Sequence, residues 1–282
     1  MLRLFERLAQ FLLTTWSVAD SRGDHKVNIT KLLMLLLTLL TATSVSAIEI
    51  FIGQRAPITG GSMLDNIPDG QYPDTLRYVD PATSVGFSMS AYFAGQVPGV
   101  VTPPAPDVPA NAQVFSYETI TGRPSGPLTL TSQGLNRNIQ VEDLRPFYEP
   151  RLVYGLLDVA RSGRGALSML FDYGVDILGL DLIGANTGEP GNVYLRLFDT
   201  RGESFQFLDL FGNLVDYLTI EAFDGPLYLT SFDRPIRGIT LTNDDYAGIG
   251  FSTVVFRTVP TPPVIALLLI GLVFLKNPGR QP

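Results

Sequence analysis

The residues of this chain that could do chemistry are mainly acids and other oxygen ligands. Among its 282 residues are 27 Asp and Glu, but no Cys and a single His, His25. Without cysteine, disulfides, thiolate metal sites and cysteine nucleophiles are excluded. His25 lies in a segment that we expect to be removed, which leaves no imidazole for Ser-His-Asp catalysis or zinc binding. We therefore predict no enzymatic activity.

Paired carboxylates are the remaining catalytic option, because glycosidases use two of them about 5–10 Å apart. The candidate pairs are Asp172 with Asp181, and Glu142 with Asp143. Nothing in their spacing fixes that separation, and the only Trp, Trp16, lies in the same removable segment. Aspartates at strand ends more often cap turns. A carbohydrate-active enzyme is therefore the weakest functional hypothesis for this sequence.

Calcium binding is a better use of these oxygens, because Ca²⁺ takes six to eight oxygen ligands. Asn243, Asp244 and Asp245 form a compact oxygen-rich loop and are our candidate calcium ligands, and residues 199–203 form a second such loop. Neither fits an EF-hand loop, and we expect no other cofactor. Four tyrosines are candidate platforms for a sugar ring or an interface: Tyr148, Tyr154, Tyr194 and Tyr246.

The N-terminal segment, residues 1–47, has the pattern of a leader. Lys31 precedes an apolar run at 32–40, and small residues follow it up to Ala47. With Val45 at −3 and Ala47 at −1, this order is typical of a secretory signal peptide, so we expect Ile48 to be the mature N-terminus; an uncleaved anchor is the alternative. Residues 1–26 are amphipathic, and they are either a long n-region or the product of a misplaced start; we prefer a start at Val27.

The C-terminal segment, residues 259–282, combines prolines, an apolar run and a basic end. The run at 264–275 is twelve residues long, which is about 18 Å as a helix and therefore short for a bilayer core of roughly 30 Å. Lys276 and Arg280 follow it. We expect a short transmembrane helix that holds the precursor at the membrane, with a buried core segment as the alternative.

The residues Val259, Pro260, Thr261 and Pro262, followed by this apolar run and basic end, resemble a PEP-CTERM sorting signal. The resemblance departs from the family at Thr261, where Glu is usual. It implies sorting by an exosortase-like protease in a Gram-negative bacterium, and a link to exopolysaccharide and biofilm. The protein would be exported to the cell envelope, the surface or the extracellular matrix.

The middle of the chain, residues 48–258, is long enough for one large core. It holds 13 Arg and no Lys against 24 Asp and Glu, a net charge of −11, which argues against nucleic-acid binding. Short strand-like runs separated by turn residues predict an all-β fold, a β-sandwich or jelly roll. The expected strands are residues 75–79, 85–93, 113–119, 128–131, 166–172, 176–183, 193–199, 204–210, 216–223, 227–232, 239–242 and 249–257.

Three further expectations concern this middle part. Along 193–199, Val193 and alternate residues are aliphatic, whereas Tyr194 and its alternates form an amphipathic face. Residues 95–110 contain five prolines and are predicted to be a loop; it could instead be a linker, but we prefer one domain. The leucines at 152–157 could form a helical turn or two.

A second resemblance concerns residues 165–172, 178–182 and 197–202, with closing strands at 238–242 and 248–251. These segments are similar to the ectodomains of PEP-CTERM proteins, which implies a lectin-like β-sandwich and carries over no catalytic residue. Our first hypothesis is therefore an exported, non-enzymatic protein that binds glycan in the matrix. The alternative is a structural or adhesive protein that binds another protein.

Overall fold

Antiparallel strands make up the part of the chain that the structure describes. In the computed structural model these residues are 48–58, 64, 67–81, 84–102, 116–143, 152–158, 161–184, 191–209, 211–221, 225–231, 234–245 and 248–259. They form nineteen strands and no helix, and all of the strand pairings between them are antiparallel. The prediction of an all-β fold is confirmed.

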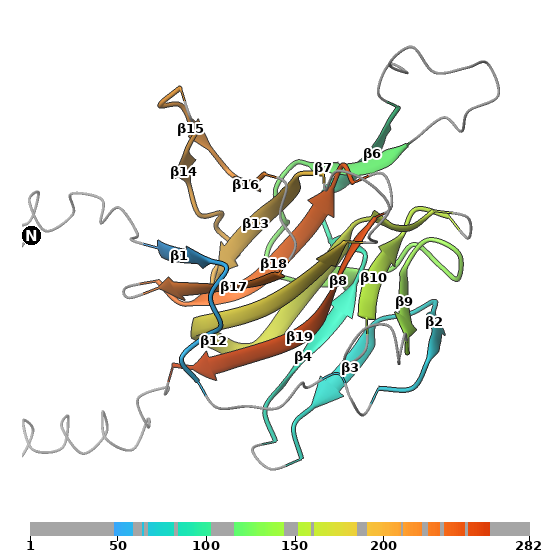
Figure 1. The fold of residues 1–282 in the computed structure, drawn as a ribbon, viewed down its shortest axis with the longest axis horizontal. Coiled ribbons are helices and arrows are strands. Elements are labelled where there is room, and N and C mark those ends of the chain that lie inside the picture. The colour runs from blue at the N-terminus through green and yellow to red at the C-terminus, as the bar shows by residue number, and fades with distance from the viewer. Residues whose placement is uncertain are drawn as a thin grey trace, which may run out of the picture. The chain divides into compact units, whose positions relative to one another are not determined.

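The long strand β12, Leu167–Gly184, joins two sheets, so that their thirteen strands are hydrogen-bonded into one continuous sheet (Figure 1). Its first half pairs with β4, Gly86–Ser90, on one side and with β18, Ile236–Asn243, on the other. Its second half pairs with β17, Gly225–Ser231, and with β19, Ile249–Thr258. The register shifts near the middle of the strand, where one set of partners gives way to the other.

The two sheets are built outward from β12. The first has the order β3-β4-β12-β18-β13-β16, and the second the order β1-β17-β12-β19-β10-β9-β2, with β11 also paired to β10. The bounds of the strands not yet given are β3 Leu76–Val79, β13 Val193–Asp199, β16 Leu218–Ile220, β1 Ile48–Ile52, β10 Leu152–Leu156, β9 Ile139–Glu142, β2 Gly70–Tyr72 and β11 Ser162–Gly165.

Three small two-stranded sheets lie outside these two (Figure 1). They are β5 Tyr92–Phe93 with β8 Leu130–Thr131, β6 Val97–Val101 with β7 Tyr117–Thr121, and β14 Phe207–Leu208 with β15 Leu214–Val215. In Figure 1 the β6–β7 and β14–β15 ribbons project from the body of the fold.

One apolar core draws its side chains from both sheets. Phe87 on β4 and Phe171 on the first half of β12 are fully buried, as are Leu180 on its second half and Phe251 on β19. Each such side chain stabilises the fold by about 1.5–3 kcal/mol. Two antiparallel sheets that share one core are consistent with a β-sandwich.

Three details of the predicted strands are wrong. Residues 95–110, which we expected to be a loop, contain the strand β6. Proline is tolerated in this strand at position 98 because β6 is an edge strand that pairs only with β7, so the missing N–H breaks no second ladder. The leucine-rich segment Leu152–Leu156 is the strand β10 and not a helical turn. The separate strands predicted at 166–172 and 176–183 are the two halves of β12.

The described residues begin next to the predicted signal peptide and end at the start of the predicted sorting signal. Ile48 is the first residue of β1, whereas Val45 and Ala47 lie outside the described residues. Val259 follows β19, and its N–H donates to the carbonyl of Gly174, 2.8 Å away. Residues 260–282 lie outside the described part. Among the described residues, no helix is long and apolar enough to cross a membrane.

Candidate functional site

The three candidate calcium ligands lie where β18 ends, and their side chains serve three different neighbours. The Asn243 amide donates to the carbonyl of Gly163 at 2.7 Å, and its oxygen accepts from the N–H of Asp245 at 3.1 Å. Asp245 is buried and accepts from the N–H of Gly191 at 2.8 Å. Asn243 and Asp245 therefore organise the backbone here, and only Asp244 is half-exposed.

Asp244 turns toward the start of β13. One of its oxygens accepts from the N–H of Asn192 at 2.5 Å, and the other accepts from the Asn192 amide at 3.2 Å and the Tyr194 hydroxyl at 2.8 Å. Gly191 permits this approach, since a Cβ there would lie 2.5 Å from the backbone N and Cα of Asp245. Donors from Asn192 and Tyr194 and the acceptor carboxylate of Asp244 thus hold the loop after β18 against the start of β13.

Tyr194 and Arg196 share the outer face of β13, because alternate residues of a strand point to the same side. The residues that alternate with them along the strand, Val193, Leu195 and Leu197, are fully buried. The Tyr194 ring meets the Tyr217 ring at a centroid distance of 6.0 Å in an edge-to-face arrangement. The Tyr217 residue comes from the segment that enters β16, which pairs with β13.

The guanidinium of Arg196 lies over the Tyr217 ring, 5.2 Å from its centroid. The Nε of Arg196 is 3.8 Å from a carboxylate oxygen of Asp216, which is an ion-pair distance and too long for a hydrogen bond. Only 12% of the Arg196 side chain is exposed, and its Nε has no hydrogen-bond partner among the described residues. Such a donor is uncommon in a folded protein.

These residues form one continuous half-buried patch, which we call the Tyr194 surface. It comprises Asn192, Tyr194, Arg196, Asp216, Tyr217 and Asp244. Desolvation, followed by the hydrogen bond to Asp244, raises the pKa of Tyr194 to about 12, so its hydroxyl stays a donor at neutral pH. Desolvation also lowers the pKa of Arg196, against the attraction of Asp216. The surface offers aromatic rings, two carboxylates and a guanidinium, which suits hydrogen bonding to a neutral polar ligand.

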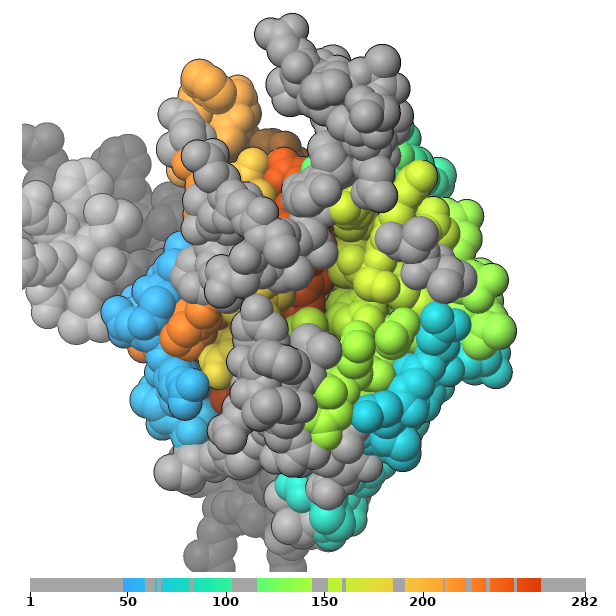
Figure 2. Space-filling view, turned by 45° about the vertical axis from the view of Figure 1, so that its right-hand side comes forward, coloured from blue at the N-terminus to red at the C-terminus, as the bar shows by residue number. Residues whose placement is uncertain are grey.

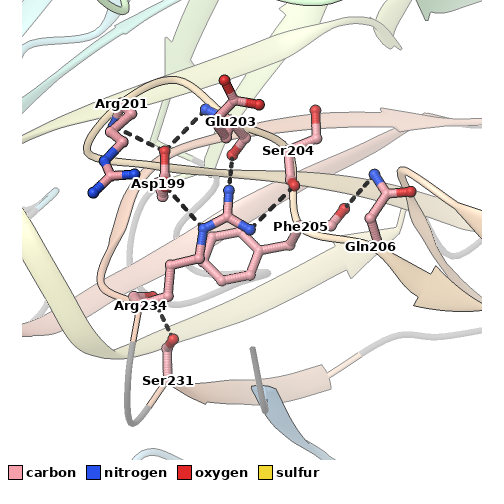
Figure 3. Close-up of polar contacts among 8 residues, drawn as sticks. All are labelled: Asp199, Arg201, Glu203, Ser204, Phe205, Gln206, Ser231 and Arg234. Atoms are coloured by element: carbon pink, nitrogen blue, oxygen red, sulfur yellow. Dashed lines mark hydrogen bonds and ion pairs between the residues drawn. The ribbon is translucent and has the colours of Figure 1, made fainter. Parts of the chain in front are cut away.

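The second oxygen-rich loop, residues 199–203, is a turn held by Asp199 (Figure 3). One Asp199 oxygen accepts from the N–H groups of Arg201 and Glu203, at 2.8 and 2.9 Å. The other accepts from the Nε of Arg234 at 2.8 Å. Desolvation raises the pKa of Asp199, but these hydrogen bonds outweigh it and hold the pKa below its ordinary value. The carboxylate thus caps a turn, as expected for aspartates at strand ends.

Arg234, from the segment between β17 and β18, completes this cluster by contacting the end of the turn and the residues just after it. Its guanidinium donates to the carbonyls of Glu203 at 2.8 Å and Ser204 at 3.3 Å, and lies 4.5 Å from the centre of the Phe205 ring (Figure 3). Both carboxylate oxygens of Asp199 and all three guanidinium nitrogens of Arg234 have hydrogen-bond partners within the protein. We therefore assign this cluster a structural role.

The first of the two carboxylate pairs considered for glycoside hydrolysis, Asp172 with Asp181, is held apart. Asp172 and Asp181 lie nine residues apart on β12, which is about 30 Å along a strand. Asp172 forms a bidentate pair with Arg77 at 2.5 and 2.7 Å, and Asp181 lies 3.4 Å from Arg55. Such a separation is far beyond the roughly 5–10 Å that a glycosidase pair needs.

Glu142, from the other candidate pair, is tied to Tyr154. Its carboxylate accepts from the Tyr154 hydroxyl at 2.6 Å. The Tyr154 side chain is buried on β10, so it cannot serve as the sugar platform that we considered. Tyr148 and Tyr246 lie outside the described residues, which leaves Tyr194 as the candidate platform that the structure places on a surface.

The sequence singled out Tyr194 and Asp244 but not Asp216, Tyr217 or the role of Arg196. The alternation along β13 was the signal that joined Tyr194 to Arg196. Within the described ranges, no group of three or more His, Cys, Asp or Glu residues is placed to hold a metal ion. Calcium binding at Asn243–Asp245 stays a prediction.

Comparison with known proteins does not assign the chain to a family. No protein-family model matches it, and no curated protein and no solved structure shows significant similarity to it. The geometry of the Tyr194 surface is therefore the basis for a functional proposal.

Proposed function

We propose that this protein is an exported, non-enzymatic, lectin-like β-sandwich that binds a polysaccharide at the cell surface or in the extracellular matrix. The observation that carries the proposal is the Tyr194 surface. It brings two tyrosine rings, two carboxylates and a guanidinium together on the outer face of β13.

Each kind of group on this surface matches one part of a sugar. A pyranose has C–H groups on its faces, which pack against aromatic rings, and hydroxyls at its edge. Each hydroxyl both donates and accepts, so it can pair with a carboxylate such as Asp216 and with the guanidinium of Arg196. The two carboxylates outnumber the one guanidinium, and residues 48–258 carry a net charge of −11. A neutral polymer therefore fits better than an acidic one.

Export and sorting belong to the same proposal. The predicted signal cleavage precedes Ile48, the first residue of β1, and the PEP-CTERM-like segment follows Thr258, the last residue of β19. Removal of both segments would leave each described strand intact. This arrangement supports an exosortase-like protease as partner and a membrane-anchored precursor.

Glycan binding is tested with the full chain on immobilised neutral polysaccharides, namely cellulose, β-1,3-glucan, mannan and chitin, and on alginate as an acidic comparison. We expect a neutral polymer to be retained, and Tyr194→Ala or Asp216→Ala to abolish retention. Tyr173→Ala is the matched control, because Tyr173 is exposed near the middle of β12 and outside the Tyr194 surface. Equal retention of all variants, or no retention of any polymer, would refute glycan binding at this surface.

Sorting is tested with a chain that ends at Thr258 and with Leu268→Arg. A central Arg costs about 2.5–3.5 kcal/mol in a membrane helix, which is enough to expel so short a span. Both variants should move from the membrane fraction to the soluble fraction, and sequencing of the exported protein should begin at Ile48. Full-length precursor in the soluble fraction would contradict the proposal.

A further inference from the structure

The β14–β15 hairpin exposes the most prominent apolar side chains in the described part of the chain. Phe211 at its tip is 89% exposed, and the cross-strand partners Leu208 and Leu214 are 72% and 70% exposed. The other cross-strand pair, Phe207 with Val215, is half-buried, and Phe207 packs against the core. Apolar side chains gathered on an exposed element commonly mark a binding surface.

Hydrogen bonds to Asp209 hold the turn at the tip of this hairpin. Asp209 accepts from the N–H groups of Phe211 and Asn213 at 2.9 and 2.7 Å, and from the Asn213 amide at 2.9 Å. Gly212, at a φ of 81°, donates to the Asp209 carbonyl at 3.0 Å. Because these contacts involve the backbone of Phe211 and not its ring, the turn holds the ring outward without depending on it.

The hairpin is continuous with the Tyr194 surface. Asp216 and Tyr217 follow β15 directly and lead into β16, which pairs with β13. Figure 1 shows β14 and β15 rising from the edge of the sheet where β16 and β13 lie. In Figure 2 the hairpin, in orange at the upper left, stands out from the body of the fold. A ligand that lies across Tyr217 and extends along the hairpin would reach Phe211.

The charges of this segment argue against a lipid bilayer as the occupant. Residues 206–217 contain two aspartates, Asp209 and Asp216, and no Lys or Arg. Proteins that bind anionic membranes place basic residues beside their inserted apolar side chains. A neutral polymer with apolar faces meets no such repulsion.

We propose that the β14–β15 hairpin extends the Tyr194 surface and packs against the next sugar units of the same neutral polysaccharide. The ligand is then an internal stretch of several units and not a terminal sugar. This inference rests on the proposed function, because it takes the Tyr194 surface as the first contact.

The test is the dependence of affinity on oligomer length. Oligomers of two to eight units, made from the polymer that the full chain retains, are titrated by calorimetry. We expect affinity to rise with length in the wild type, and Phe211→Ala to bind long oligomers roughly tenfold more weakly while binding short ones unchanged. Val100→Ala, on the exposed β6 strand, is the matched control and should behave as the wild type.

Other outcomes separate this inference from the proposed function. If oligomers bind but length has no effect, or Phe211→Ala binds all lengths like the wild type, the inference is wrong and the proposed function stands. If the polymer is retained but no oligomer of up to eight units binds, the inference is wrong as well; if no polymer is retained at all, the proposed function fails with it. Binding of vesicles that contain anionic lipid, or self-association in sedimentation, that Phe211→Ala abolishes would identify a membrane or a second copy as the occupant and overturn the inference.

Discussion

Replacing Asp199 by Ala should destabilise the protein strongly, because one buried carboxylate holds both a turn and an arginine. The change removes hydrogen bonds from the N–H groups of Arg201 and Glu203 and the ion pair with Arg234. Breaking a largely buried ion pair costs about 3–5 kcal/mol. Arg234 keeps its contacts with two carbonyls and an aromatic ring, so we expect a loss of about 3–4 kcal/mol.

The assay is urea unfolding at pH 7, followed by circular dichroism. For a domain of this size the expected loss corresponds to a melting temperature lower by about 10 °C. Asp209→Ala is the control, since Asp209 caps a turn of the same kind, Asp-x-x-Gly, on the exposed hairpin and has no arginine partner among the described residues. Its effect should be much smaller. A loss below about 1 kcal/mol for Asp199→Ala would refute the argument that this carboxylate organises the turn.

The lowered pKa of Asp199 predicts that its contribution to stability depends on pH. Its pKa is lowered in the folded state, so its stabilising contribution is present above the unfolded pKa of about 3.9 and is lost as the pH falls through the folded pKa. The difference in unfolding free energy between the wild type and Asp199→Asn should therefore be constant from about pH 5 to 7 and shrink below about pH 4. A difference that stays constant as the pH falls below the unfolded pKa of about 3.9 would contradict the assigned ion pair.

The remaining predictions concern a buried acid and a close backbone contact. The Glu118 side chain is fully buried, and desolvation raises its pKa despite hydrogen bonds from Ala166 and Gln133. The stability of the wild type relative to Glu118→Gln, measured by urea unfolding, should therefore fall as the pH rises above the unfolded pKa of about 4.3. Gly191→Ala should cost about 1–3 kcal/mol and weaken glycan retention, because its Cβ would press on the Asp245 backbone, whereas Gly99→Ala should be tolerated in both measurements.

The strands that the sequence predicted best are those with strong local patterns. Alternating burial along β13 and the β-branched residues of β19 are local properties, and both strands were expected within a residue of their observed ends. The strands that were missed, such as β2 and β9, are short and lie toward the edge of a sheet. Their pairing is determined by distant partners, which a local pattern does not reveal.

Distant pairing also limited how much of the candidate site could be predicted from the sequence. Tyr194 and Asp244 were singled out for their residue types, but their contact depends on β13 and β18 lying side by side, 50 residues apart in sequence. Tyr217 joins them through the pairing of β13 with β16. Asn243 and Asp245 had suitable oxygens as well, yet the fold uses them to hold backbone groups. Residue type indicated the chemistry, and the topology decided which side chains can reach a ligand.

The pairing of β19 has a mechanical consequence for a chain tethered through its C-terminal segment. β19 lies between β12 and β10 and is antiparallel to both. The hydrogen bonds of an antiparallel ladder run perpendicular to the strands. A pull on residue 259 along β19 therefore loads many ladder bonds together in shear and does not open them one at a time. The C-terminal end of the described fold would therefore resist tension applied along β19.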